Sequence, residues 1–195
     1  MASRYYEQVD GKSVCIDGEI PFDIPSSWAW TRLGMIGSWG AGATPSRGNP
    51  VYYKNGTIPW LKTGDLNDGV IVNIPEFITK EALQKTSLQL NPIGSVLIAM
   101  YGATIGKLGI LAIEATTNQA CCACKSFTGI QNNFLFWYLF SQRKQFKALG
   151  DGGAQPNISK DKIVDYLIPL PPKDEQNRIS DKITSVFQFI QDSQA

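Results

Sequence analysis

The sequence contains no histidine among its 195 residues. Without an imidazole the chain cannot build a Ser-His-Asp or Cys-His nucleophile system, or an HExxH zinc helix. It also has no imidazole base that would act near neutral pH. Many hydrolytic mechanisms depend on one of these groups, so the composition argues against hydrolase chemistry.

Long apolar runs are also missing, because no stretch approaches the roughly 18 apolar residues that a membrane-spanning helix needs. Residues 1–12 are polar and lack the apolar stretch of a secretory signal. We therefore expect a soluble, cytoplasmic protein with no membrane partner.

Cysteine is scarce and unevenly placed, with Cys15 alone and Cys121, Cys122 and Cys124 crowded together. A zinc site usually takes two pairs of ligands from separate segments, and Cys15 cannot supply a second pair. We expect no metal, and interpret residues 119–127 as a buried strand in which cysteine acts as a small apolar residue.

The residues that are present describe a folded, turn-rich protein. Apolar residues make up 43% and charged residues 18%, with 18 glycines and 11 prolines. The length allows one ordinary domain and a short appendage. Charge is segregated, because residues 31–150 carry 11 basic and 5 acidic side chains and both flanks are mildly acidic. Such a middle region could hold one face against phosphates.

The pattern of elements predicts an α+β fold, with an irregular β-rich domain, a few short helices and a C-terminal helix of coiled-coil type. Proline spacing predicts an extended leader over residues 1–24 and a domain over 25–172. Short apolar runs between turn residues predict strands at 58–61, 95–100, 108–113 and 119–127. Capping and helix-stop signals predict helices at 79–85 and 134–149 and a short one after Ser159. Residues 166–172 should be extended.

The last segment, residues 173–195, begins with a helix that carries a stripe of apolar side chains. Four apolar residues follow one another at spacings of four, three and four, namely Ile179, Ile183, Val186 and Ile190. This spacing predicts a seam suited to coiled-coil packing, and Phe187 widens the stripe. The alternative is a terminal helix folded onto its own domain. The expected partner interface consists of Ile179, Ile183, Val186, Phe187 and Ile190.

Three motifs resemble catalytic signatures but do not satisfy them. Gly102–Lys107 has three residues between its glycines, and Leu108 follows the lysine where a phosphate-binding loop needs Ser or Thr. Asn49–Tyr52 lacks the second proline of the adenine-holding motif of amino-methyltransferases. Asp65 and Asp68 form a close acidic pair, but Gly69 makes them typical turn residues. We expect no catalytic residue and no cofactor.

The more informative feature is a set of loops in which polar, amide and basic side chains stand next to aromatic ones. These loops lie at residues 44–54, 60–65 and 155–157, and the glycine-bounded turn at 101–107 could lie against a polyanion. Arg, Lys, Asn and Gln can pair with base edges, and Ser, Thr and Tyr reach phosphates. Ordinary turn chemistry would also account for these residues.

A series of motifs, in order along the chain, resembles the specificity subunit of type I restriction-modification systems. The motifs are Ile24–Trp28, Arg32–Gly34, Thr44–Ser46, Ile58–Leu66, Gly94–Lys107, Thr116–Gln119, Gly153–Ile158 and Ile168–Ile179. Lys173 departs from the family pattern, because an apolar residue commonly follows the paired prolines there. The terminal helix is also shorter than a full spacer.

The resemblance implies a target recognition domain and the start of the spacer helix that separates two such domains in the usual subunit. It implies no catalysis by this chain, since separate subunits modify and cleave the DNA. The implied partners are double-stranded DNA, the modification and restriction subunits, and a second copy pairing through residues 173–192. Alternatives are a docking module with weak DNA affinity, or the DNA-binding half of a methyltransferase.

On this hypothesis the loops face the duplex. Phosphate contacts are expected from Lys54, Lys62 and Lys107, and base contacts from Arg47, Gln155 and Asn157. The remaining expected contacts carry hydroxyl groups and are Thr44, Ser46, Thr63, Tyr101 and Thr104.

Overall fold

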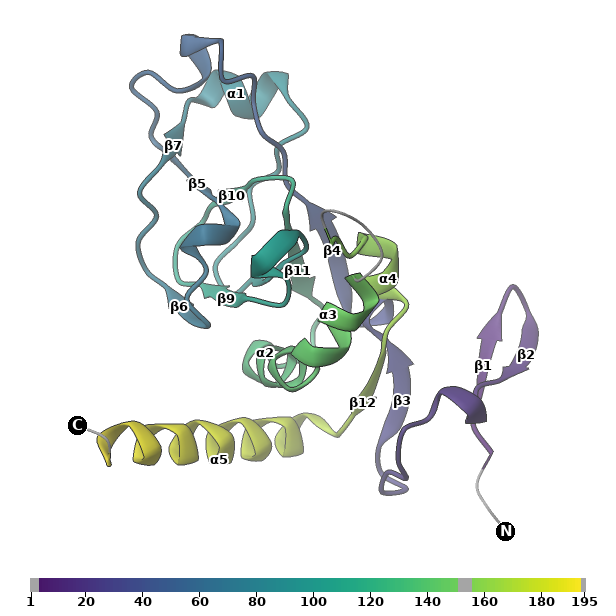
Figure 1. Ribbon diagram of the computed structural model, residues 1–195. Coiled ribbons are helices and arrows are strands. Elements are labelled where there is room, and N and C mark those ends of the chain that lie inside the picture. The colour runs from purple at the N-terminus through teal and green to yellow at the C-terminus, as the bar shows by residue number, and fades with distance from the viewer. Residues whose placement is uncertain (1–3, 151–155, 194–195) are drawn as a thin grey trace.

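A five-stranded sheet forms the centre of the protein in a computed structural model that describes residues 4–150 and 156–193 (Figure 1). Its strand order is β4 (Gly37–Ala41), β11 (Cys121–Ser126), β8 (Val96–Ala99), β9 (Leu108–Leu111) and β6 (Gly69–Ile71). Neighbours are antiparallel except for β6 and β9, which are parallel. The α+β class expected from the sequence is confirmed.

Strands β8 and β11 are buried on both faces, which explains their continuous apolar sequences. Cys122 and Cys124 point into one core cluster, whereas Cys121 and Ala123 belong to the cluster on the opposite face. Burial raises the pKa of the Cys122 and Cys124 thiols to about 12, so both remain protonated at neutral pH. The buried strand predicted for the cysteines is confirmed.

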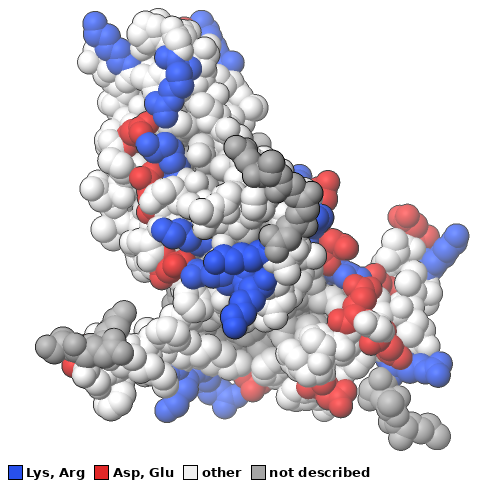
Figure 2. All heavy atoms as spheres, viewed as in Figure 1, with Lys and Arg blue, Asp and Glu red and all other residues white. Residues whose placement is uncertain are grey.

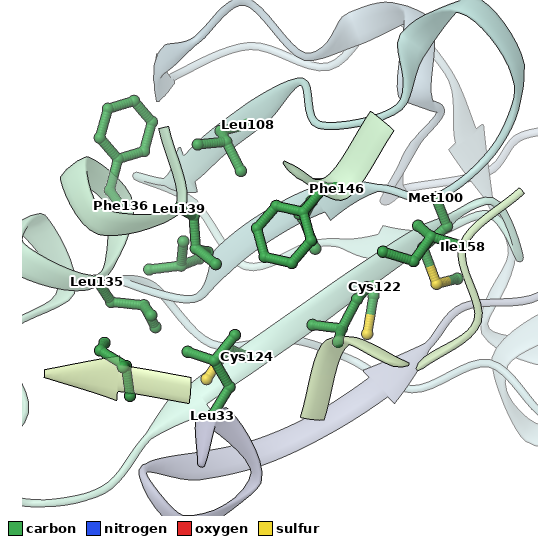
Figure 3. Close-up of a cluster of buried hydrophobic side chains, with 14 of the residues drawn as sticks. Leu33, Met100, Leu108, Cys122, Cys124, Leu135, Phe136, Leu139, Phe146 and Ile158 are labelled. Atoms are coloured by element: carbon green, nitrogen blue, oxygen red, sulfur yellow. The ribbon is translucent and has the colours of Figure 1, made fainter. Parts of the chain in front are cut away.

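Two helices, α2 (Asn132–Ser141) and α3 (Arg143–Gly150), cover the Cys122 face of the sheet (Figure 3). Leu135, Leu139 and Phe146 enter the same core cluster as Cys122. The prediction of a single helix over 134–149 was wrong, because the helix is interrupted at Gln142. There the Gln142 side chain accepts a hydrogen bond from the Tyr166 hydroxyl at 2.9 Å.

A smaller lobe is built on a three-stranded sheet of β10 (Thr116–Thr117), β5 (Ile58–Leu61) and β7 (Phe77–Ile78). The short helix α1 (Lys80–Lys85) and the 3-10 turn η3 (Pro50–Tyr52) complete it. Its separate core consists of Trp60, Ile78, Ala82 and Leu88. Thr79 caps α1 as predicted, since its hydroxyl accepts from the Ala82 N–H at 3.2 Å.

The segment expected to be an extended leader contains a β-hairpin, which corrects that part of the prediction. Strands β1 (Tyr6–Val9) and β2 (Lys12–Cys15) pair across Asp10 and Gly11, whose φ angles of 49° and 75° are those of a tight hairpin turn. The 3-10 turn η1 (Asp17–Glu19) follows. Asp-Gly is a strong hairpin signal that the proline-based interpretation overlooked.

The two ends of the central domain are joined by β3 (Ala29–Arg32) and β12 (Leu167–Leu170), which pair antiparallel in a sheet of two strands. This pairing confirms the extended segment predicted there, and a two-stranded sheet tolerates Pro169. Between the core and β12, Ser159 caps the predicted short helix α4 (Lys160–Val164), its hydroxyl accepting from the Lys162 N–H at 3.2 Å.

The terminal helix α5 (Lys173–Asp192) runs away from the β3–β12 pair along α2 (Figure 1). Its first half is packed on the domain, because Gln176 and Ser180 are buried and Ile179 joins the core. Further along, the Phe187 ring stacks on Trp137 with centroids 4.8 Å apart. The helix is therefore attached to its own domain, while Val186 and Ile190 stay exposed. No helix in the described part of the chain is long and apolar enough to span a membrane.

Candidate DNA interface

Residues 116–120, here called the central segment, bring three of the predicted loops together. The Ala43 N–H donates to the Thr117 carbonyl at 3.0 Å, and the Asn118 N–H donates to the Leu61 carbonyl at 2.9 Å. The Met100 N–H donates to the Ala120 carbonyl at 2.8 Å. Loops 42–47, 62–65 and 100–107 are thus tied to one short stretch of backbone.

Gly42 allows the closest of these approaches. A Cβ atom at this position would lie 2.0 Å from the Thr117 carbonyl oxygen, a distance that no side chain can occupy. Next to it, the Thr44 hydroxyl bonds the Gln119 side chain, so the first loop is tied by both backbone and side chain. Residues 116–119 belong to one of the family motifs in the sequence, but only the fold reveals their place at the centre of the site.

In the smaller lobe, Arg47 and Lys62 converge on a residue that the sequence analysis missed, Glu76. One Glu76 oxygen accepts from both terminal nitrogens of Arg47, at 3.2 and 3.1 Å, and the other oxygen pairs with the Lys62 ammonium. The pKa of Glu76 lies below its ordinary value mainly because Lys62 donates to the carboxylate, with Arg47 adding to the effect. The pairing of Glu76 with these two cations can be seen only in the fold, because Glu76 lies well after both of them in the sequence.

The Arg47 guanidinium also lies over two aromatic rings. Its central carbon is 4.6 Å from the centroid of Trp60 and 4.9 Å from that of Tyr53. Both rings are anchored, since the Trp60 indole donates to the Ala43 carbonyl at 3.0 Å and the Tyr53 hydroxyl donates to the Pro45 carbonyl at 2.5 Å. We call Arg47, Lys62, Glu76, Tyr53 and Trp60 the arginine cluster.

The other expected residues of this lobe lie at its exposed turns. Lys54 is exposed where η3 ends, and Ser46 is exposed in the loop that carries Arg47. Thr63 begins the 3-10 turn η4 (Thr63–Asp65), which Asp65 closes by accepting from the Lys62 N–H at 2.8 Å. Asp65 therefore acts as a capping residue, in agreement with its interpretation as part of a turn.

A second group of expected residues surrounds the 3-10 turn η5 (Gly102–Thr104). Tyr101 and Asn157 form an isolated β-bridge, and the Gly102 N–H donates to the Pro156 carbonyl at 2.9 Å. Thr104 donates to the Tyr101 carbonyl at 2.8 Å, and Lys107 is partly exposed beside it. The turn leads into strand β9 and not into a helix, so it lacks the architecture of a phosphate-binding loop. Gln155 lies outside the described residues.

Helix α3 adds a basic surface that the sequence analysis used only as a helix-stop signal. Arg143 is structural, because it donates to the Gly106 carbonyl at 2.8 Å and pairs with Asp68. Lys144 and Lys147 are exposed, and Figure 2 shows Lys and Arg side chains gathered over α3. Three cations within five residues, in the basic middle of the chain, were the available sequence signal.

Several acidic side chains have structural partners at the opposite end of the molecule. In Figure 2 they gather over β3 and the N-terminal hairpin, where Glu7 and Glu19 pair with Arg32 at 2.8 and 2.7 Å. No group of three His, Cys, Asp or Glu residues that could hold a metal lies within residues 4–150 and 156–193.

The fold of the described residues is similar to that of a solved HsdS subunit. The HsdS subunit from Thermoanaerobacter tengcongensis superposes with a TM-score of 0.72 at 21% sequence identity, over 90% of this chain and 42% of that one. This likeness establishes the class of fold.

The sequence comparisons establish the family. Residues 25–194 match the model of the type I restriction modification DNA specificity domain, and the chain belongs to this family. It is 29% identical over 155 residues to the EcoR124I/EcoR124II specificity subunit of Escherichia coli, covering 77% of this chain and 38% of that subunit. It is also 29% identical over 175 residues to the MjaIX specificity subunit of Methanocaldococcus jannaschii, covering 87% and 39%. The chain thus spans about two fifths of the length of these relatives.

Proposed function

We propose that this chain recognises one half of a bipartite duplex DNA site and directs the modification and restriction subunits of a type I complex to it. It performs no bond-breaking step itself. The observation that carries this proposal is the attachment of three polar and basic loops to the central segment. Family membership supports a role in DNA specificity.

Within this surface we assign base contacts to Arg47 and to the amide of Asn157, and the base contact expected of Gln155 rests on the sequence alone. Phosphate contacts fall to Lys54 and Lys107, which are exposed or partly exposed at the rims of the two groups. The hydroxyl groups of Ser46, Thr63 and Tyr101 are suited to phosphate oxygens, whereas the Thr104 hydroxyl already donates its single proton to the Tyr101 carbonyl. Lys62 differs from the other lysines, because Glu76 already holds its ammonium group.

The test is selection from a randomised duplex DNA library with the chain assembled on its modification subunits. Sequencing the bound fraction should show one enriched half-site. Arg47→Ala should change the preference at one base pair, whereas Lys107→Ala should weaken all sequences alike and lower the salt slope by about 1. An unenriched library would refute base recognition, and an unchanged motif for Arg47→Ala would remove Arg47 from it.

A second candidate, a docking module for the modification subunits, is favoured by the apolar end of α5. Val186, Phe189 and Ile190 are 45%, 73% and 45% exposed there. Salt separates the two functions, because phosphate binding weakens steeply as salt rises and apolar docking does not. Ile183, Val186, Phe187 and Ile190 remain a proposal for the contact with a second copy or a modification subunit, whereas Ile179 packs against the core of its own domain.

A further inference from the structure

The arginine cluster holds the Arg47 side chain in one orientation. Two aromatic rings lie within 4.9 Å of the guanidinium carbon, and the Glu76 carboxylate accepts from both of its terminal nitrogens. The Arg47 side chain is still 55% exposed. Its other N–H donors have no protein acceptor among the described residues, so they are available to a ligand from solvent.

Glu76 itself is fixed by the fold. The Trp60 N–H donates to the Glu76 carbonyl at 2.9 Å, and Trp60 is only 1% exposed in the core of the smaller lobe. Lys62 pairs with the carboxylate oxygen that Arg47 leaves free. Contacts to both the backbone and the side chain of Glu76 therefore fix the position of its carboxylate. The side chain is still 33% exposed.

The cluster combines two cations with one anion, and the Glu76 carboxylate lies against both cations. A phosphate group approaching Arg47 and Lys62 would meet the Glu76 carboxylate, and two like charges in close contact repel each other. A base edge fits better, because an arginine fork pairs with the O6 and N7 acceptors of guanine while a carboxylate accepts from the exocyclic amine of cytosine.

We propose that Glu76 is a specificity-determining positioning residue, which orients the Arg47 fork toward a base edge and keeps phosphates away from it. In this assignment Lys62 anchors Glu76 and does not contact the DNA backbone. The proposal rests on the function proposed above, since it concerns how that same surface distinguishes one base pair.

The test compares Glu76→Gln with the wild-type chain in the library selection, using the chain assembled on its modification subunits. Glutamine has nearly the same shape but no charge. Discrimination at one base pair should fall by about tenfold or more, within the range expected for one bidentate contact. Binding to random duplex should tighten, and its salt slope should steepen by up to about 0.9 for one added phosphate contact.

Glu81→Gln is the matched control. Glu81 lies on α1 in the same lobe, pairs with Lys85 at 2.7 Å, and removal of its charge leaves the arginine cluster intact. This variant should keep the wild-type base preference at every position. If it lost discrimination to the same extent as Glu76→Gln, the effect would come from net charge alone and the proposal would be refuted.

Arg47→Lys provides a second route that does not depend on Glu76→Gln being folded. Lysine keeps the positive charge but loses the two-pronged donor, so random-duplex affinity should persist while discrimination at the same base pair is lost. The proposal is overturned if either folded variant, Glu76→Gln or Arg47→Lys, retains wild-type discrimination within twofold. A wild-type chain that enriches no motif would instead refute the proposed function.

Discussion

Individual residues control the interface mostly through contacts that hold loops in place. Gly42 and Glu76 are examples, since neither is a residue type that sequence analysis would assign to base reading at that position. Gly42 lets the chain approach the Thr117 carbonyl, and Glu76 neutralises a cation that otherwise looks free. The role of a residue in the interface therefore depends on which atoms lie next to it in the fold.

Gly42→Ala should destabilise the protein and weaken DNA binding together. The new Cβ would meet backbone, which cannot rotate away, so we expect a loss of at least about 2 kcal/mol of unfolding free energy, within the range known for overpacking. Urea denaturation measures this change. Gly48→Ala is the control, because nothing lies within 4 Å of its Cβ position, and equal stability losses for both variants would contradict the contact.

Glu7 supplies a pH-dependent attachment of the N-terminal hairpin. It accepts from Arg32 at 2.9 and 2.8 Å, and chiefly this hydrogen bonding holds the pKa of Glu7 below its ordinary value of 4.5. A lowered pKa means that the stabilisation is fully present above pH 4.5 and is lost as the pH falls through the value in the folded protein.

We therefore expect Glu7→Gln to be less stable than the wild type at pH 7, by less than about 1 kcal/mol for a pair at the surface. The difference should vanish as the pH falls below the lowered pKa of Glu7. Urea midpoints for both proteins between pH 7 and pH 2.5 test this expectation. A difference that stayed constant over this range would show that the charge of Glu7 contributes nothing.

Among the elements, α3 combines a structural face with a charged one. Phe146 is fully buried against the sheet, Arg143 bonds the turn before β9, and Lys144 and Lys147 remain exposed. The Arg143 contact with Gly106 places this basic helix next to Lys107 and the Tyr101–Asn157 bridge. On the proposed function, the helix would therefore extend the rim that we assign to phosphate contacts.

Replacing both Lys144 and Lys147 with alanine should weaken binding to every duplex sequence without changing the preferred one. If each lysine neutralises one phosphate, the slope of log affinity against log salt should fall by about 1.8 in total. Affinity measured at several salt concentrations checks this. Lys12→Ala with Lys182→Ala, on the hairpin and on α5, is the control, and an equal fall there would show a general charge effect.

At the scale of the whole molecule, the basic loops and the exposed apolar end of α5 lie on different parts of the domain. The exposed end of α5 projects away from the loops (Figure 1). On the proposed function, DNA and a protein partner would therefore bind to separate surfaces at the same time. A second copy joined through α5 would place two recognition surfaces about a two-fold axis, as a bipartite site requires.

Replacing Val186 and Ile190 with aspartate should abolish this self-association and leave the recognised half-site unchanged. Both side chains are 45% exposed, so the substitutions should have little effect on folding of the domain. Sedimentation velocity measures the oligomeric state. Asn177→Asp with Ser185→Asp adds the same charge to the helix outside the apolar seam and should preserve a dimer, and a wild-type chain that stays monomeric at high concentration would refute pairing through α5.

Local sequence rules were sufficient for several elements of the fold. The continuous apolar run at 95–100, the Thr79 cap and the cysteine-rich strand each contain their own structural signal, and all were predicted. The break at Gln142 and the N-terminal hairpin were missed, although Asp10-Gly11 was a readable signal. The break was not readable, because residues 134–149 contain no glycine or proline that would signal the end of a helix.

The sequence by itself determined the family, the α+β class, the positions of several strands and the residue types that could meet DNA, because these follow from local patterns and ordered motifs. Only the tertiary structure decided how those residues are grouped. It brought three loops to the central segment and paired Arg47 and Lys62 with Glu76. The physical reason is that charge pairing acts through space over a few ångströms, and residues far apart in the chain come within that range only after folding.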